Sequence, residues 1–150
     1  MLAYLAVAAT FGPRRIELSS IHQEDIHLSL PTLMIRAAKR GRWRTMQLPR
    51  EVVPVVQRHY FRPLALNTMS KIWVKLMDDT IGMVPGTGFH TIRRSLATEF
   101  LMAGASETAV AKFMGWALSG NTWGALPVYD WRTDHELFRD LWPKHPILSS

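Results

Sequence analysis

Apolar residues in the first third of the chain form one fully apolar run, followed by shorter ones. Residues 1–11 are apolar on every side, which is typical of a helix enclosed by a core, and Gly12-Pro13 ends the run. A second, short helix is expected through residues 14–19. Short runs of apolar and β-branched residues then predict a small antiparallel sheet, with strands over residues 27–30, 32–37 and 42–48 and a turn at 39–41.

From Pro49 onward, apolar residues recur at the spacing of amphipathic helices. The intervening segment 82–88 is too rich in Gly and Pro for regular structure, and it leads directly to His90. Gly104 is a natural C-terminal stop and Ser106 a natural N-cap. Helices are therefore expected from 49 to about 60 and over 70–77, 90–103, 106–114 and 134–142, so the predicted fold is mainly α with a small antiparallel sheet.

Composition fits one folded domain over residues 1–150, with 47% hydrophobic residues available for a core. The formal charge of +6 favours a polyanionic partner, and nucleic acid is the first class to consider. There is no cysteine, which excludes disulfides and thiolate metal sites. The apolar opening lacks a basic leader and is too short to span a bilayer, so no membrane association is expected.

Histidine and arginine side chains supply the first candidate chemistry. His90 and Arg93 are three residues apart on a predicted helix, so they would share one face and could bind neighbouring oxygens of one phosphate. Arg14 follows the first helix, and we expect it and Arg93 to be exposed. Taken separately, each of these residues also fits a solvated surface.

Three stretches together resemble the tyrosine recombinase, or phage integrase, family. Residues 12–18 look like the family's Gly-x-Arg-x-x-Glu-Leu segment, with Arg14 as its arginine. Residues 39–48 are similar to a basic β-hairpin whose lysine would be Lys39, with Arg44 and Leu48 kept in frame. Residues 90–98, then Gly104 and 113–116, look like the family's His-x-x-Arg helix and its Leu-Gly-His/Trp turn, here ending at Trp116.

The resemblance implies a tyrosine recombinase catalytic-domain fold and a metal-independent reaction in which DNA strands are cut and rejoined. Arg14 and Arg93 would stabilise the charged phosphate, His90 would donate a hydrogen bond or move a proton, and Lys39 would protonate the leaving 5′ oxygen. Trp116 would contact the phosphate through its ring N–H, although plain core packing is the alternative for this side chain. The chain would begin inside the catalytic domain, without the N-terminal domain that clamps DNA.

The nucleophile implied by the resemblance is Tyr129. The chain has three tyrosines, and of these Tyr4 lies in the buried first helix, Tyr60 precedes the His-x-x-Arg stretch and Tyr129 follows Trp116. The separation of 13 residues from Trp116 is longer than is usual in the family, and Pro127 lies beside it. A half-buried aromatic in a variable loop is the alternative interpretation.

The expected partner is duplex DNA. The chain is expected to form a homo-oligomer, a tetramer, on DNA, with a monomer as the alternative in isolation. The expected location is the cytoplasm. The terminal apolar stripe Leu137, Phe138, Leu141 and Trp142 could pack on a neighbouring subunit or on its own core. No cofactor is implied, and the histidines lack metal-ligand spacing. The alternatives are a catalytically degenerate relative that only binds DNA, and an RNA-binding or basic structural module.

Overall fold

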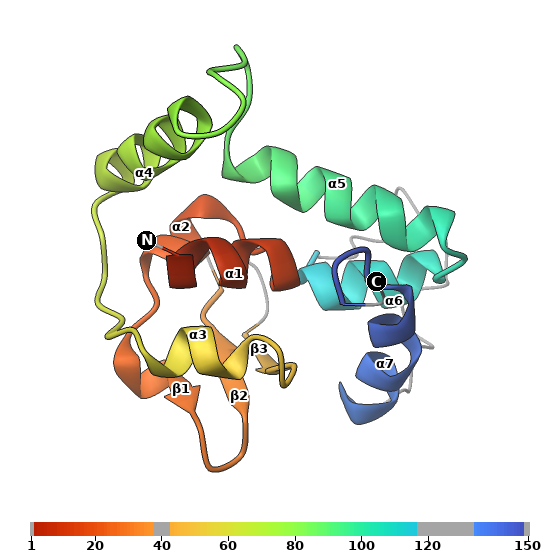
Figure 1. Ribbon diagram of the computed structural model, residues 1–150. Coiled ribbons are helices and arrows are strands. Elements are labelled where there is room, and N and C mark those ends of the chain that lie inside the picture. The colour runs from red at the N-terminus through yellow and green to blue at the C-terminus, as the bar shows by residue number, and fades with distance from the viewer. Residues whose placement is uncertain (1, 38–42, 117–133, 149–150) are drawn as a thin grey trace.

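A computed structural model describes residues 2–37, 43–116 and 134–148 of the chain. It is mainly helical with one small antiparallel sheet, as the sequence predicts (Figure 1). The α-helices are α1 (Leu2–Phe11), α2 (Arg15–Ser19), α3 (Val53–Gln57), α4 (Leu66–Asp78), α5 (Phe89–Met102), α6 (Glu107–Met114) and α7 (Asp134–Leu141). Two 3-10 turns, η1 (Gln23–Asp25) and η3 (Trp142–Lys144), precede the sheet and follow α7, respectively.

The sheet has the order β1-β2-β3, with β1 at Ile26–His27, β2 at Thr32–Ile35 and β3 at Arg44–Gln47. Its strands are shorter than predicted. Ile26 pairs with Leu33 and His27 with Thr32, so residues 28–31 form the connection and not a strand. Pro31 has no backbone N–H to add to the ladder, and only its oxygen extends the pairing with β3, by accepting from the Leu48 N–H at 2.7 Å.

Two helices also differ from the prediction. The helix expected from 49 to 60 is limited to α3, where Pro54 occupies the first turn, the part of a helix that tolerates proline. The helix expected over 70–77 begins earlier, at Leu66. Its buried residues Met69, Trp73 and Met77 are spaced four apart and form one stripe toward the core.

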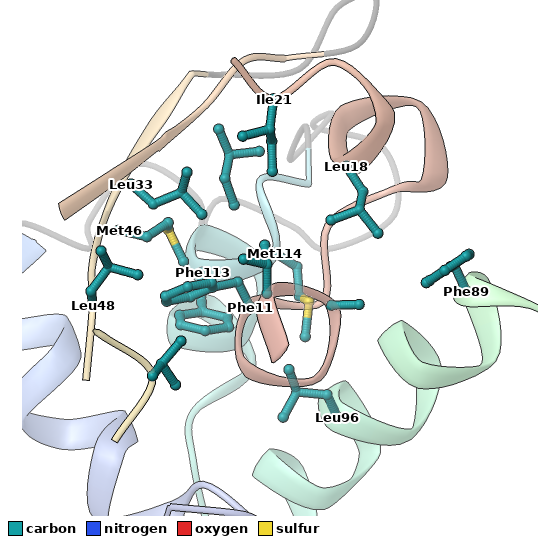
Figure 2. Packing of buried hydrophobic residues seen from close by; sticks show 14 of the residues in the cluster. Phe11, Leu18, Ile21, Leu33, Met46, Leu48, Phe89, Leu96, Phe113 and Met114 are labelled. Carbon is teal, nitrogen blue, oxygen red and sulfur yellow. The ribbon is translucent and has the colours of Figure 1, made fainter. Parts of the chain in front are cut away.

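Helix α1 lies at the centre of the fold. It packs on α5, α3 and α2, and α5 continues the contact to α6 (Figure 1). Phe11 at its end is fully buried, and Figure 2 shows it near Phe113 and Met114 of α6, with Leu96 of α5 close to Met114. The predicted enclosure of this helix is therefore confirmed, with only its first residue, Leu2, strongly exposed.

The C-terminal helix α7 packs on the core of its own chain. Leu137, Phe138 and Leu141 are buried, and the Phe138 ring stacks on that of Trp142 at 5.1 Å. Of the two interpretations of this apolar stripe, the structure supports packing on its own core. Within the described residues, every helix is too short or too polar to cross a membrane.

Candidate active site

A buried carboxylate organises the segment that contains Arg14. Glu17 is only 2% exposed, and its Oε2 accepts a hydrogen bond from the backbone N–H of Arg14 at 2.8 Å. Its Oε1 accepts another from Arg14 Nη1 at 2.7 Å. Glu17 therefore stabilises the first turn of α2, where backbone donors lack partners, and holds the Arg14 side chain beside the same turn.

A second arginine, Arg44 of β3, reaches this carboxylate from the sheet. Its Nη2 donates to Glu17 Oε2 at 2.9 Å, and its Nη1 donates to the backbone oxygen of Phe113, near the end of α6, at 3.1 Å. The side chain is buried, and its Nε has no hydrogen-bond partner among the described residues. Arg44 thus joins β3, α2 and α6 at one point.

Arg93 of α5 approaches from the other side. Its Nη1 donates to the backbone oxygen of Gly12, and its Nη2 donates to that of Met114 at 2.7 Å. The residue is 8% exposed, so our expectation of an exposed arginine was wrong. The reason is that α5 packs directly on α1, and the side chain caps carbonyls at the ends of α1 and α6 that the helices themselves leave unpaired.

The end of α6 is shaped to receive these arginines. At the opposite end, Ser106 caps the start of α6 by accepting a 3.2 Å hydrogen bond from the Ala109 N–H, as predicted. The helix stops at Gly115, whose φ of +62° is the left-handed value that favours glycine. A Cβ at Gly115 would lie 2.7 to 2.9 Å from the Arg44 guanidinium, so this position also needs glycine for space.

The three guanidiniums and the one carboxylate form a cluster with an excess of positive charge. Although burial alone would raise it, the pKa of Glu17 is lowered by the hydrogen bond from the Arg14 backbone and by the charges of Arg44 and Arg14. Burial, then the charges of Arg14 and Arg44, lower the pKa of Arg93 to about 10, with Glu17 opposing them. Arg93 still carries its charge at neutral pH, so the cluster favours an anion.

Trp116 follows Gly115 and lies beside this cluster. Its backbone N–H donates to the oxygen of Ala111 at 3.0 Å, which closes the end of α6. The Arg93 guanidinium carbon lies 5.9 Å from the centre of its ring, within range of a cation–π interaction. The residue is 37% exposed, so core packing alone does not describe it.

Of the remaining predicted residues, one lies at the start of α5 and two lie outside the described part of the chain. His90 is the second residue of α5 and is exposed, one helical turn before Arg93. Its Nδ1 would come within 3.0 Å of a Cβ at Gly88, so the ring lies against the start of the helix. Lys39 and Tyr129 fall outside the described residues.

The two other tyrosines lie in different surroundings. Tyr4 is buried in α1, where its hydroxyl donates to the backbone oxygen of Arg62 at 2.7 Å, and burial raises its pKa. Tyr60 is 74% exposed in the segment between α3 and α4. No group of three or more metal-ligating side chains occurs within the described ranges.

Sequence reasoning did not assign Glu17 and Arg44 to the site, although both lie in the motifs that it used. The signal that could have identified them is the resemblance itself, because Glu17 belongs to the first of its motifs and Arg44 to the second. If the two motifs lie close together, an acidic and a basic side chain within them can form an ion pair.

Comparison with solved structures agrees with this architecture. Over 96% of its length, the chain is similar to the crystal structure of XerA recombinase, with a TM-score of 0.66 and 20% sequence identity. The chain has a recombinase-like fold. It spans 57% of the length of that solved chain. No protein-family model and no curated protein sequence matches it.

Proposed function

We propose that this chain is the catalytic part of a tyrosine recombinase, which cuts and rejoins DNA strands through a 3′-phosphotyrosine intermediate. The observation that supports the proposal most strongly is the convergence of Arg14, Arg44 and Arg93 around Glu17. Two of these arginines are the ones that the family's motifs single out, and they come from segments far apart in the sequence. The recombinase-like fold is the second line of support.

Phosphoryl transfer through a phosphorane-like state needs positive donors that are fixed before the negative charge develops. Arg14 has this character, because Glu17 orients its guanidinium and part of the side chain remains open to solvent. Arg93 is held by two backbone carbonyls, and its charge is not fully neutralised by the single carboxylate. In this proposal, both arginines bind the non-bridging oxygens of the scissile phosphate.

The other roles come from the family resemblance. Tyr129 would attack the phosphate and form the covalent link, and Lys39 would protonate the leaving 5′ oxygen. His90 would donate a hydrogen bond or move a proton, and Trp116 would contribute its ring N–H. The bond energy is retained in the phosphotyrosine link, so the proposal needs neither metal nor nucleotide.

Duplex DNA is the proposed partner, and we propose that the chain assembles on it as a homo-oligomer, a tetramer in the complete reaction, in the cytoplasm. A positive charge excess at the cluster and a net charge of +6 both favour a polyanion over a neutral ligand. Phosphate contacts carry no direct sequence information, so the target site has to be found by selecting bound duplexes from a randomised pool.

Covalent trapping tests the proposal. A pool of nicked duplexes with randomised sequence around the nick is incubated with the chain, and adducts are separated on a denaturing gel. We expect an adduct with the wild-type chain and none with Tyr129→Phe. Tyr60→Phe is the matched control, because Tyr60 is exposed and lies outside the cluster, and it should form the adduct as the wild type does.

The same experiment separates the alternatives. Undiminished trapping by Tyr129→Phe would contradict the assigned nucleophile. Retained binding of duplex DNA without any adduct would favour a degenerate relative that only binds DNA. Equal binding of duplex DNA and RNA in competition would favour a general basic module.

A further inference from the structure

The end of helix α1, which leads into the arginine cluster, is held by two side chains that are distant in sequence, Arg93 and His145. Thr10 and Gly12 lie at this end, where helix carbonyls lack intrahelical donors. The Gly12 oxygen accepts from Arg93, and the Thr10 oxygen is 3.0 Å from Nε2 of His145, 135 residues away along the chain. The C-terminal segment therefore contacts the turn that delivers Arg14.

The hydrogen bonds of His145 define its tautomer. The backbone N–H groups of Ile147 and Leu148 both point to its Nδ1, at 3.2 and 3.3 Å. Because a backbone N–H can only donate, Nδ1 must be the unprotonated acceptor. The Thr10 carbonyl can only accept, so Nε2 carries the proton and donates to it. The ring is fully buried and neutral in this arrangement, and it links the tail to α1.

Aromatic packing fixes the same region. The centre of the His145 ring lies 5.5 Å from that of Phe100 and 5.7 Å from that of Trp142, and both pairs pack edge to face. Trp142 also contacts the rings of Phe11, at 6.0 Å, and Phe113, at 5.8 Å. Phe11 precedes Gly12, whose carbonyl accepts from Arg93, and the Phe113 carbonyl accepts from Arg44. The aromatic residues are therefore joined through the backbone to carbonyls that bind both buried arginines.

We propose that His145 is a positioning residue for the arginine cluster. Through the Thr10 carbonyl it fixes the last turn of α1, and thereby the course of Gly12-Pro13 into Arg14. The effect on catalysis rests on the proposed recombinase function, whereas the effect on the structure of this turn does not. Docking of the C-terminal segment and the order of the phosphate site are therefore coupled in this chain.

Two substitutions separate the two sides of the ring. His145→Gln places an amide nitrogen near the position of Nε2, so it can still donate to Thr10. His145→Asn places an amide oxygen near the position of Nδ1, so it can still accept from Ile147 and Leu148 but is too short to reach Thr10. The two variants have similar polarity, and each retains one half of the interaction.

Amide hydrogen exchange of the full chain is the readout, because it does not depend on activity. The Gly12 N–H donates to Ala8 and the Arg14 N–H to Glu17, so both amides report on the turn. We expect the Asn variant to lose at least about tenfold in protection at these two amides relative to the Gln variant, while amides of the sheet stay unchanged. The rate of DNA cleavage should likewise be lower in the Asn variant than in the Gln variant.

Wild-type protection of Gly12 and Arg14 in the Asn variant, or equal losses in both variants, would overturn the proposal. A nitrogen-15 NMR spectrum of the wild-type protein that shows His145 as the neutral tautomer protonated on Nδ1 would also overturn the proposal, without need of a variant. If the wild-type chain does not cleave DNA but the Asn and Gln variants still differ in exchange, the recombinase function fails and the positioning role of His145 stands.

Discussion

At the scale of single residues, the cluster depends on the buried carboxylate of Glu17. It accepts hydrogen bonds from Arg14 and Arg44 and lies within electrostatic range of Arg93. Two buried arginine charges without it would face each other with little solvent to screen them. Glu17 therefore reduces the repulsion within the cluster but leaves it positive, and an anion can supply the remaining compensation.

Replacing Glu17 with Gln should lower the free energy of unfolding by roughly 3–5 kcal/mol, the usual cost of breaking a buried ion pair from one side. Urea unfolding followed by circular dichroism measures it. Glu24→Gln is the matched control, because Glu24 makes an exposed ion pair with Arg36, and its cost should stay below about 1 kcal/mol. Equal losses in the two variants would refute the structural role given to Glu17.

The buried His145 predicts a dependence of stability on pH. Burial lowers its pKa from the usual 6.5, with the Thr10 hydrogen bond opposing. The unfolded chain therefore binds a proton more readily than the folded one, so this contribution is complete above about pH 6.5 and is lost as the pH falls through the folded-state pKa.

Thermal unfolding between pH 7.5 and 5.5 checks this prediction. The melting temperature of the wild type should fall with pH, and that of His145→Gln should fall less, because glutamine does not titrate. The slope that remains is expected from His59, whose pKa is also lowered by burial. Identical slopes in the two proteins would contradict the account of His145.

The sequence made some residues of the site predictable and left others hidden. The motifs predicted Arg14 and Arg93 as parts of one site, and the structure brings both arginines close to Glu17. The burial of Arg93 was not, because it results from the packing of α5 on α1 and from carbonyls of Gly12 and Met114 that no local pattern reveals. Arg44 lies in one of the motifs, but its contact with Glu17, 27 residues away, was not predicted, because it depends on how β3 packs against α2.

At the scale of elements, the end of α6 is the part that the site constrains most. Gly115 combines a positive φ with a close approach to Arg44, whereas Gly104, at the end of α5, has a φ of +81° and open space around it. Both positions favour glycine for conformational reasons. Only Gly115 also needs it for the position of a site arginine.

Gly115→Ala should therefore destabilise the protein more than Gly104→Ala. The left-handed conformation at either position costs a residue with a Cβ about 1–2 kcal/mol, and the steric contact with Arg44 adds to this cost at Gly115 alone. Chemical denaturation of the two variants measures the difference. If the two losses are equal, Arg44 does not occupy the place beside Gly115 that the account assigns to it.

Element identity was more predictable than element length. The strong periodicity of α5 and α6 and the glycines after them placed both helices almost correctly, because local signals set their ends. The strands were predicted too long, because pairing register decides where a strand ends, and register depends on partners such as Leu33 and Met46. The helix predicted from 49 to about 60 was also longer than α3.

At the scale of the whole molecule, the C-terminal segment closes the fold. Helix α7 contacts α6 and β3, and the residues after it reach back to the end of α1 (Figure 1). The C-terminal segment thus contacts the end of α1 that leads into the arginine cluster. Because these contacts join segments far apart in the sequence, the sequence alone left open whether the apolar stripe of α7 packs on its own core.

The most direct test of the proposed function is to identify the amino acid that becomes attached to DNA. Adducts formed by the wild-type chain on the randomised nicked duplexes are digested with protease and nuclease, and the remaining peptide is sequenced by mass spectrometry. The account predicts a peptide that carries a 3′-phosphate link on Tyr129. Attachment through another residue, or to a 5′ phosphate, would contradict it.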